Sequence, residues 1–246
     1  MNFLEHRDRP SPNHDARGGP AGIDMLVLHY TGMVSAEAAL ERLCDPAARV
    51  SAHYLVDEDG TIWQLVSEVR RAFHAGRSFW RGETDLNRVS IGIEIVNPGH
   101  EWGYRAFPDL QMAAVEHLCR DLLSRLPIPP DRIVGHSDIA PDRKIDPGEL
   151  FDWPRLARAG IGIWPAPGHR PIAVPVDRVR ALADLEAIGY GAPPASPGAA
   201  VAAFQRRYRQ SRCDGRIDSE TAARIAEVRA AYDAQRRPAP GPSGVN

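Results

Sequence analysis

The chain has 246 residues, enough for one domain of ordinary size and a smaller second domain. Its 30 basic and 32 acidic side chains nearly cancel, so no strong electrostatic field attracts nucleic acid or anionic lipid, and a partner must be recognised at a local site. No apolar run approaches the ~18 residues that a membrane-spanning helix needs. These features exclude a membrane span and give no support to a nucleic-acid partner.

The first 22 residues are rich in Pro, Gly, Asn and Asp, and they predict an irregular lead-in. They contain no apolar segment of the kind that a secretory signal requires. We therefore expect a cytoplasmic protein, with the periplasm as the alternative if an export signal is missing from this sequence.

The next hundred residues alternate between strand-like and helix-like patterns. A continuous apolar run favours a buried strand, helix formers behind a Ser favour a capped helix, and alternation around Asp-Gly favours a hairpin. The predicted elements are a buried strand at 23–30, a helix at 35–43 with Ser35 as its N-cap, a hairpin at 51–66, and a second buried strand at 90–96.

An amphipathic helix is predicted at 109–126, where apolar residues recur at helical spacing until three prolines end the pattern. A short strand at 131–135 follows and leads into His136. Strands that alternate with helices predict an α/β domain with a mixed central sheet flanked by helices, spanning residues 1–164.

The remainder of the chain has a different composition. Residues 165–175 are rich in Pro and predict a fairly stiff linker. Helical patterns at 177–188, 198–208 and 219–236 predict a small three-helix domain over residues 176–236. The last ten residues, 237–246, predict a disordered tail.

Three distant residues, His29, His136 and Asp146, can be folded into one metal site. Zinc binds imidazole nitrogen and carboxylate oxygen, and a catalytic zinc keeps its fourth position for water. His29 ends a buried strand, where α/β sheets place their clefts. Each residue also has a simpler interpretation, because a lone His often caps a strand and an Asp-rich loop is usually a set of turns. His53 and His74 compete as ligands, so the residues alone do not select the set.

Glu94 is the least easily explained residue, because it lies inside the apolar run S-I-G-I-E-I-V. A carboxylate in a buried strand is costly unless it is paired or hydrated. If its face of the strand lines a cleft, Glu94 is a candidate general base with a raised pKa; if the strand is an edge with a wet face, it has no special role. A metal site, Glu94 as acid/base and Lys144 as a nearby cation would together supply the active site of a hydrolase.

Several segments resemble the zinc-dependent N-acetylmuramoyl-L-alanine amidases of the type 2 amidase family, over roughly residues 10–155. The motifs that carry the resemblance are L-V-L-H-Y-T, V-S-A-H-Y-L-V-D-E-D-G, A-F-H-A-G, S-I-G-I-E-I-V-N, G-H-S-D-I-A-P-D-R-K-I-D-P-G and F-D-W. The resemblance implies zinc ligands at His29, His136 and Asp146, an acid/base at Glu94 and an oxyanion-stabilising Lys144.

In that family His53 and His74 match motif positions that do not bind the metal. We expect substrate contacts from four further residues: His53, His74, Trp80 and Asn97. The C-terminal segments A-L-A-D-L-E-A-I-G-Y-G, A-V-A-A-F-Q-R-R-Y and D-G-R-I-D-S-E-T-A resemble the three-helix peptidoglycan-binding domain.

The expected activity is hydrolysis of the amide between N-acetylmuramic acid, or its 1,6-anhydro form, and the L-alanine of the stem peptide, in peptidoglycan recycling or turnover. A non-catalytic peptidoglycan recognition module and a peptidase that cuts within the stem peptide are the alternatives. The absence of a signal favours soluble muropeptides as the substrate, whereas the C-terminal resemblance favours polymeric peptidoglycan.

Overall fold

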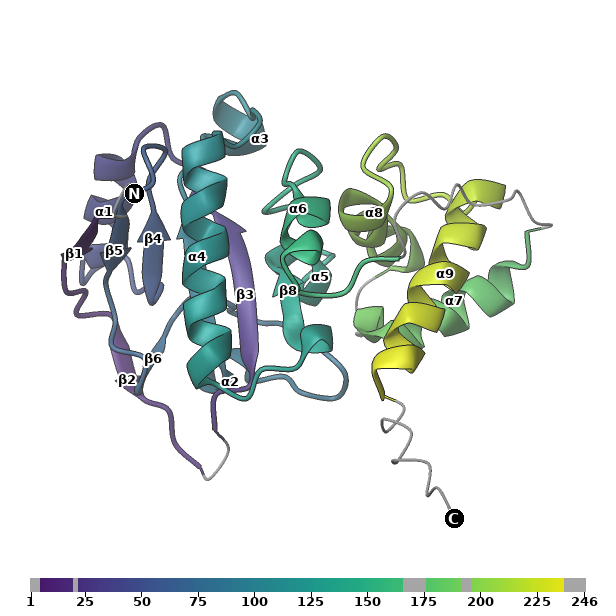
Figure 1. Cartoon of the computed structure of the whole chain (residues 1–246), viewed down its shortest axis with the longest axis horizontal. Helices are drawn as coiled ribbons and strands as arrows, with labels where there is room; N and C mark the ends of the chain where they lie inside the picture. Colours follow the sequence, from purple (N-terminus) through teal and green to yellow (C-terminus); the bar gives the residue numbers. More distant parts are fainter. Residues whose placement is uncertain (1–4, 20–21, 166–175, 192–195, 237–246) are drawn as a thin grey trace, which may run out of the picture.

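The computed structural model describes residues 5–19, 22–165, 176–191 and 196–236 (Figure 1). The predicted linker at 165–175, apart from its first residue, and the predicted tail at 237–246 lie outside this part of the chain. No helix in the described ranges is both long enough and apolar enough to cross a membrane.

A mixed six-stranded sheet forms the centre of the first 164 residues, with the order β1-β5-β4-β7-β3-β8. The β4–β5 hairpin is antiparallel, and the other neighbours in this sheet run parallel. A second sheet pairs β2 with β6. The strands are β1 His6–Asp8, β2 His14–Ala16, β3 Met25–Tyr30, β4 Tyr54–Val56, β5 Ile62–Gln64, β6 Arg70–Ala72, β7 Ser90–Ile95 and β8 Ile133–Gly135.

Helices flank this sheet, as the sequence predicts for an α/β domain. Ser35 caps α1 by accepting a hydrogen bond from the backbone of Ala38, which confirms the predicted cap. The helical segments are α1 Ala36–Cys44, α2 Leu86–Val89, α3 Gly99–Trp102, α4 Asp109–Arg125, η1 Pro130–Arg132, α5 His136–Ile139, α6 Trp153–Arg158, α7 Arg178–Leu185, η2 Glu186–Tyr190, α8 Pro197–Tyr208 and α9 Ser219–Arg236.

The N-terminal lead-in is not irregular as predicted. Residues 6–8 form β1, which pairs in parallel with β5, and residues 14–16 form β2, which pairs with β6. Neither three-residue strand has an alternating apolar pattern: β1 is exposed, and β2 is half-buried at two of its three residues. Their partners lie more than fifty residues away, so a local pattern could not reveal them.

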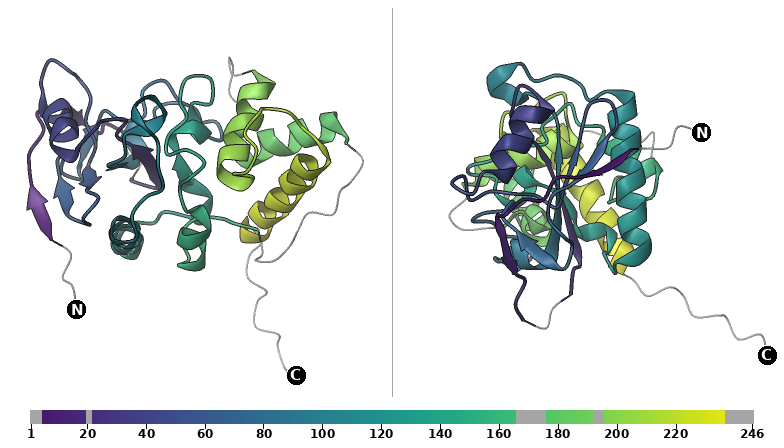
Figure 2. Two further views of the ribbon diagram at one scale, coloured as in Figure 1. Left: turned by 90° about the horizontal axis from the view of Figure 1, so that it is seen from above. Right: turned by 90° about the vertical axis from the view of Figure 1, so that its left-hand side faces the viewer.

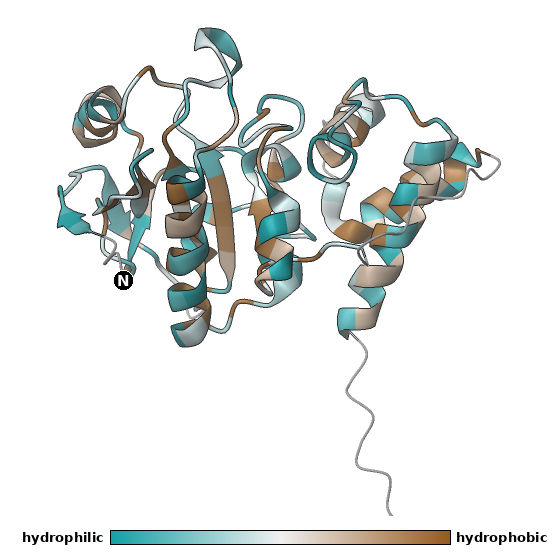
Figure 3. Cartoon of the chain, turned by 45° about the horizontal axis from the view of Figure 1, so that its top comes forward, coloured by the Kyte–Doolittle hydropathy of each residue, from teal (hydrophilic) through white to brown (hydrophobic). Residues whose placement is uncertain are grey.

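The central sheet has one apolar face and one functional face. Helix α4 covers the first face and alternates apolar and polar bands, as an amphipathic helix does (Figure 3). Its buried residues pack on the side chains of β3 and β7 that point toward it: Leu26, Leu28, Ile91, Ile93 and Ile95. The alternation of a strand then directs His29 and Glu94 to the opposite face.

The three C-terminal helices pack beside β8 and α5, at the end of the molecule opposite β1 (Figure 2). One buried apolar cluster contains residues of both regions, among them Val27, Trp80 and Val134 from the first and Ile188 and Phe204 from the second. The two regions therefore share a core in the structure.

Residues of two segments that resemble the peptidoglycan-binding domain, A-V-A-A-F-Q-R-R-Y and D-G-R-I-D-S-E-T-A, hold the C-terminal helices together. Gln205 is fully buried; its amide donates to the carbonyl of Arg216 and contacts the hydroxyl of Thr221, and its oxygen accepts a hydrogen bond from Gly215. The buried Gln205 and Thr221 thus specify the fold of this region, whereas Asp214 is exposed.

Candidate functional site

Three neighbouring strands bring the candidate residues to one edge of the sheet. His29 near the end of β3 is the direct parallel partner of Glu94 on β7, so the two side chains project from the same face. On the other side of β3, strand β8 ends at Gly135 and His136 begins α5. The backbone N–H of Ser137 donates to the carbonyl of Asp146 at 2.8 Å, which folds the following loop back toward His136.

His29, His136 and Asp146 form a compact set of potential metal ligands. The Nδ1 atoms of the two histidines are 2.9 Å apart, and each lies 3.1 Å from Oδ2 of Asp146. All three residues are buried. Three ligands at the bond lengths of a tetrahedral zinc lie about 3.3 Å from one another, so this set is close to the required spacing.

Hydrogen bonds on the far side of the rings orient both histidines. His136 Nε2 lies 3.1 Å from the carbonyl of Ala75, which can only accept, so Nε2 carries the proton and Nδ1 has a free lone pair. His29 Nε2 lies 3.1 Å from His74 Nδ1. When His29 Nδ1 is a ligand, its Nε2–H donates to His74.

The chain of hydrogen bonds continues behind His74. Its Nε2 lies 3.1 Å from the Ser90 hydroxyl, which donates to the carbonyl of Leu86 at 2.6 Å. Gly92 makes room for this arrangement, since a Cβ there would lie 2.4 Å from the His74 ring. The glycine of I-G-I-E thus lets His74 pack against β7 and support His29.

The buried environment favours the protonation states that metal binding needs. Burial and the neighbouring His136 lower the pKa of His29 to about 4, so this imidazole is neutral at pH 7. Burial opposes ionisation of Asp146, but its contacts with His136 and His29 hold its pKa below the ordinary value. Neutral imidazoles and an ionised carboxylate are the forms that bind a cation.

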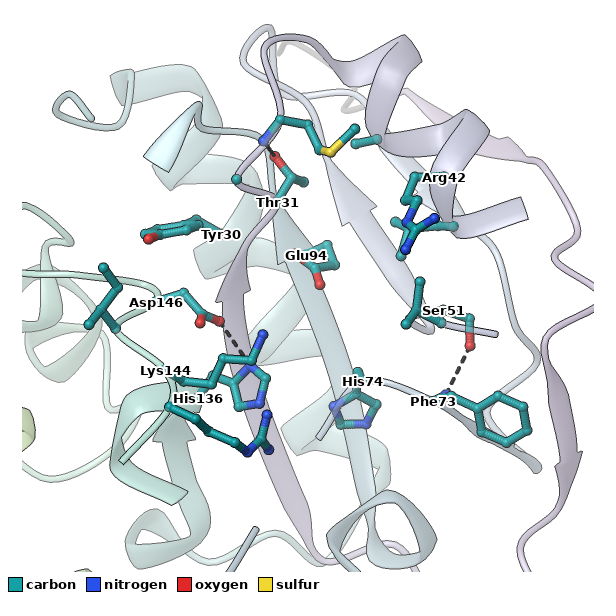
Figure 4. Close-up of a pocket in the computed structure, with 17 residues that line it drawn as sticks. Tyr30, Thr31, Arg42, Ser51, Phe73, His74, Glu94, His136, Lys144 and Asp146 are labelled. Carbon is teal, nitrogen blue, oxygen red and sulfur yellow. Dashed lines mark hydrogen bonds and ion pairs between the residues drawn. The ribbon is translucent and has the colours of Figure 1, made fainter. Parts of the chain in front are cut away.

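A pocket of about 430 Å³ opens over this set. Figure 4 shows Glu94 in its middle, with Asp146, Lys144 and His136 on one side and His74 on the other. Glu94 Oε2 is buried and makes no hydrogen bond. Burial and the charge of Asp146 raise the pKa of Glu94, whereas Lys144 lowers it. Because Glu94 lines the pocket and no hydrogen bond holds its Oε2, its carboxylate is a candidate acid/base.

The expected substrate contacts differ in position. Of the four residues, only His74 lines the pocket. His53 is fully buried behind it, and its Nδ1 accepts a hydrogen bond from the backbone of Gly92. Asn97 is buried and holds the following loop by donating to the carbonyl of Arg105. These two side chains therefore support the pocket wall from behind.

Trp80 does not reach the pocket. It is fully buried, donates to the carbonyl of Asp131, and packs edge-on against Tyr190. Gly189 lies directly on its ring, with no room for a Cβ. The expectation that Trp80 contacts substrate is contradicted by this position, because residues that follow it by more than a hundred positions cover the ring.

Two residues near the site were not selected from the sequence. Tyr30 follows His29 and lines the pocket, and burial raises its pKa to about 12. Asp138 lies in the Asp-rich loop for which the sequence favours simple turns, but it is buried and ion-paired two positions after His136. The adjacency of both residues to the histidines in the sequence was the available signal.

Comparisons with known proteins agree with this geometry. A family model described as N-acetylmuramoyl-L-alanine amidase matches residues 18–149, which include every candidate ligand, Glu94 and Lys144. The chain belongs to this amidase family. Its relatives include the N-acetylmuramoyl-L-alanine amidase AmiD of Escherichia coli K12, which is 39% identical over 84% of this chain and 82% of AmiD.

The amidase also resembles 1,6-anhydro-N-acetylmuramyl-L-alanine amidase AmpD of Haemophilus influenzae, at 36% identity over 61% of this chain and 89% of AmpD. Among solved structures, AmiD of E. coli in complex with anhydro-N-acetylmuramic acid-L-Ala-D-γ-Glu-L-Lys matches with a TM-score of 0.76 and 36% identity, over 91% of this chain and 93% of AmiD.

AmpDH3 of Pseudomonas aeruginosa in complex with anhydromuramic pentapeptide matches this amidase with a TM-score of 0.77 and 32% identity, over 91% and 96% of the two chains. Both structural matches extend through the C-terminal helices. The mixed sheet flanked by helices is thus the fold of known amidases, as the sequence predicts.

Proposed function

We propose that this amidase uses zinc, bound by His29, His136 and Asp146, to hydrolyse the amide between a muramic acid sugar and the L-alanine of its stem peptide. One observation carries the proposal. Two imidazole nitrogens and a carboxylate oxygen converge within 3.1 Å, beneath a pocket that Glu94 also lines.

Zinc is the metal that this donor set fits best. Two nitrogens, one oxygen and a fourth position open to the pocket are the pattern of catalytic zinc sites. The contact of His136 Nε2 with a backbone carbonyl is also typical of zinc-binding histidines, whereas His29 Nε2 has an imidazole nitrogen as its partner. When bound, zinc polarises a carbonyl and lowers the pKa of water to about 7, which supplies a nucleophile at neutral pH.

Glu94 has the position and environment of the acid/base. Its carboxylate takes the proton of the attacking water as the water adds to the carbonyl carbon of the amide, and it then delivers this proton to the departing amine of L-alanine. Lys144 lines the same pocket, and its ammonium stabilises the negative charge that develops on the carbonyl oxygen.

The substrate class follows from the relatives whose complexes contain anhydromuramyl peptides. We propose soluble muropeptides of this type as substrates, with polymeric peptidoglycan as a second substrate class. The resemblance of the C-terminal helices to a peptidoglycan-binding domain favours the polymer. Parallel assays on anhydro-muropeptides and on purified sacculi would separate the two.

The metal assignment can be tested directly. We expect a chelator to abolish hydrolysis and stoichiometric zinc to restore it. The Asp146→Ala protein should fold but lose most of its bound zinc, measured by elemental analysis after dialysis. Full zinc content in Asp146→Ala would show that the ligand set is wrong.

A further inference from the structure

Asp138 lies at the junction between the candidate metal site and the C-terminal helices. It is two residues beyond His136, and its Oδ2 accepts a hydrogen bond from the backbone N–H of Gly135 at 2.8 Å. This bond closes the turn that begins with His136. The direction in which His136 leaves β8 therefore depends on where the Asp138 carboxylate is held.

Two residues from the C-terminal helices hold this carboxylate. Arg207 of α8 donates to Oδ2 at 2.8 Å, and the Tyr190 hydroxyl at the end of η2 donates to Oδ1 at 2.6 Å. Arg207 also donates to the carbonyl of Ile133 at 3.0 Å, at the start of the strand that leads to His136.

This ion pair is among the most deeply buried polar contacts between the two regions. The side chains of Arg207 and Asp138 are 2% and 1% exposed. The guanidinium lies over the ring of Trp153, 4.1 Å from its centroid, so it cannot turn away from the carboxylate without losing this packing. Separating two partners of a buried ion pair is strongly destabilising, so the two regions must stay docked for the Asp138 carboxylate to keep its position.

We propose that the C-terminal helices brace the metal site, and that Tyr190 and Arg207 are positioning residues that act on His136 through Asp138. This role is additional to any binding of peptidoglycan by these helices, and it rests on the proposed function of His136 as a metal ligand. Neither residue lines the pocket, so neither is a catalytic residue.

The test compares two matched substitutions, Tyr190→Phe and Tyr208→Phe, in the full chain. Each removes one buried hydroxyl from the same aromatic cluster. The Tyr208 hydroxyl contacts the carbonyl of Ile163 and the hydroxyl of Tyr232, not Asp138. Zinc affinity is measured by competition with a chromogenic chelator, and kcat and KM are measured on a soluble anhydro-muropeptide.

We expect Tyr190→Phe to weaken zinc binding about 10-fold, the low end of the range for groups bonded directly to metal ligands, because Tyr190 acts on His136 through Asp138. It should also lower kcat with KM unchanged. Tyr208→Phe should match the wild type in both. If Tyr190→Phe fails to fold, Arg207→Lys serves in its place, since it keeps the charge but loses the forked geometry; it should also weaken zinc binding.

The outcomes separate this inference from the proposed function. Suppose that the wild-type protein binds zinc and cleaves muropeptide, and that Tyr190→Phe and Tyr208→Phe both keep the wild-type zinc affinity. This result would overturn only the proposed support of the metal site by the C-terminal helices. Equal losses in the two variants would also overturn it, because the effect would then be general destabilisation. A wild-type protein that binds no zinc would overturn both proposals.

Discussion

At the scale of single residues, the site depends on histidines whose neighbours fix the tautomer or the protonation state of the ring. The Ala75 carbonyl restricts His136 to the tautomer with a free Nδ1, and burial keeps His29 neutral. Glu94 shares the pocket with a single lysine, Lys144. The sequence alone could not choose the ligands from nine histidines, because the choice depends on which ring nitrogens converge.

Glu94→Gln should remove the proposed acid/base and leave the proposed metal ligands intact. We expect turnover to fall by about 10²-fold or more while zinc content stays at the wild-type level. Steady-state kinetics and elemental analysis measure the two quantities. The control is Glu41→Gln at an exposed position of α1, which should change neither turnover nor zinc content. Loss of zinc in Glu94→Gln would instead make Glu94 part of the metal site.

Lys144→Met should shift the pH profile as well as lower kcat. The positive charge of Lys144 lowers the pKa of Glu94, and the base must be ionised to act, so removal of this charge raises the pH at which activity is lost on acidification. The acidic limb of kcat/KM against pH should therefore move to higher pH. Lys144→Arg, which keeps the charge, should leave the limb in place; a limb unmoved in both variants would contradict this electrostatic role.

At the scale of elements, the strongly patterned segments could be predicted from the sequence. The period-two pattern of β7 places Ile91 and Ile93 toward α4 and leaves Glu94 on the functional face. The positions of Trp80 and Asp138 could not be predicted, because their surroundings come from residues 189–190 and 207, which no local pattern connects to them.

Gly92→Ala should disturb both the packing of β7 and the contact through which His74 orients His29. The new methyl group would overlap the His74 ring, so we expect a loss of about 1–3 kcal/mol in unfolding free energy together with weaker zinc binding. Chemical denaturation and chelator competition measure these effects. Gly22→Ala, where nothing lies within 4 Å, is the matched control. Equal stability of the two variants would show that His74 can move away at little cost.

At the scale of the whole molecule, the apolar core extends from Val27 and Trp80 in the first region to Ile188 and Phe204 in the second. The composition of the sequence predicts two regions and a linker, but composition does not reveal how tightly two regions dock. The buried Arg207–Asp138 pair and the cover that Gly189 gives to Trp80 join them in the fold.

This shared core predicts one cooperative unfolding transition for the full chain. Docking buries Trp80, Tyr190 and Arg207, so neither region can unfold without exposing the core of the other. Scanning calorimetry should show a single peak whose calorimetric and van't Hoff enthalpies agree. Two separated peaks would mean that the regions are independent.

The central claim is that the pocket cuts the amide between the muramic acid sugar and L-alanine. The most direct measurement is mass spectrometry of the products that the zinc-loaded protein releases from a 1,6-anhydro-muropeptide. We predict two products, the free anhydro-N-acetylmuramic acid and an intact stem peptide that begins with L-alanine. A sugar that still carries L-alanine, with a shortened peptide, would show cleavage within the stem and would contradict the account.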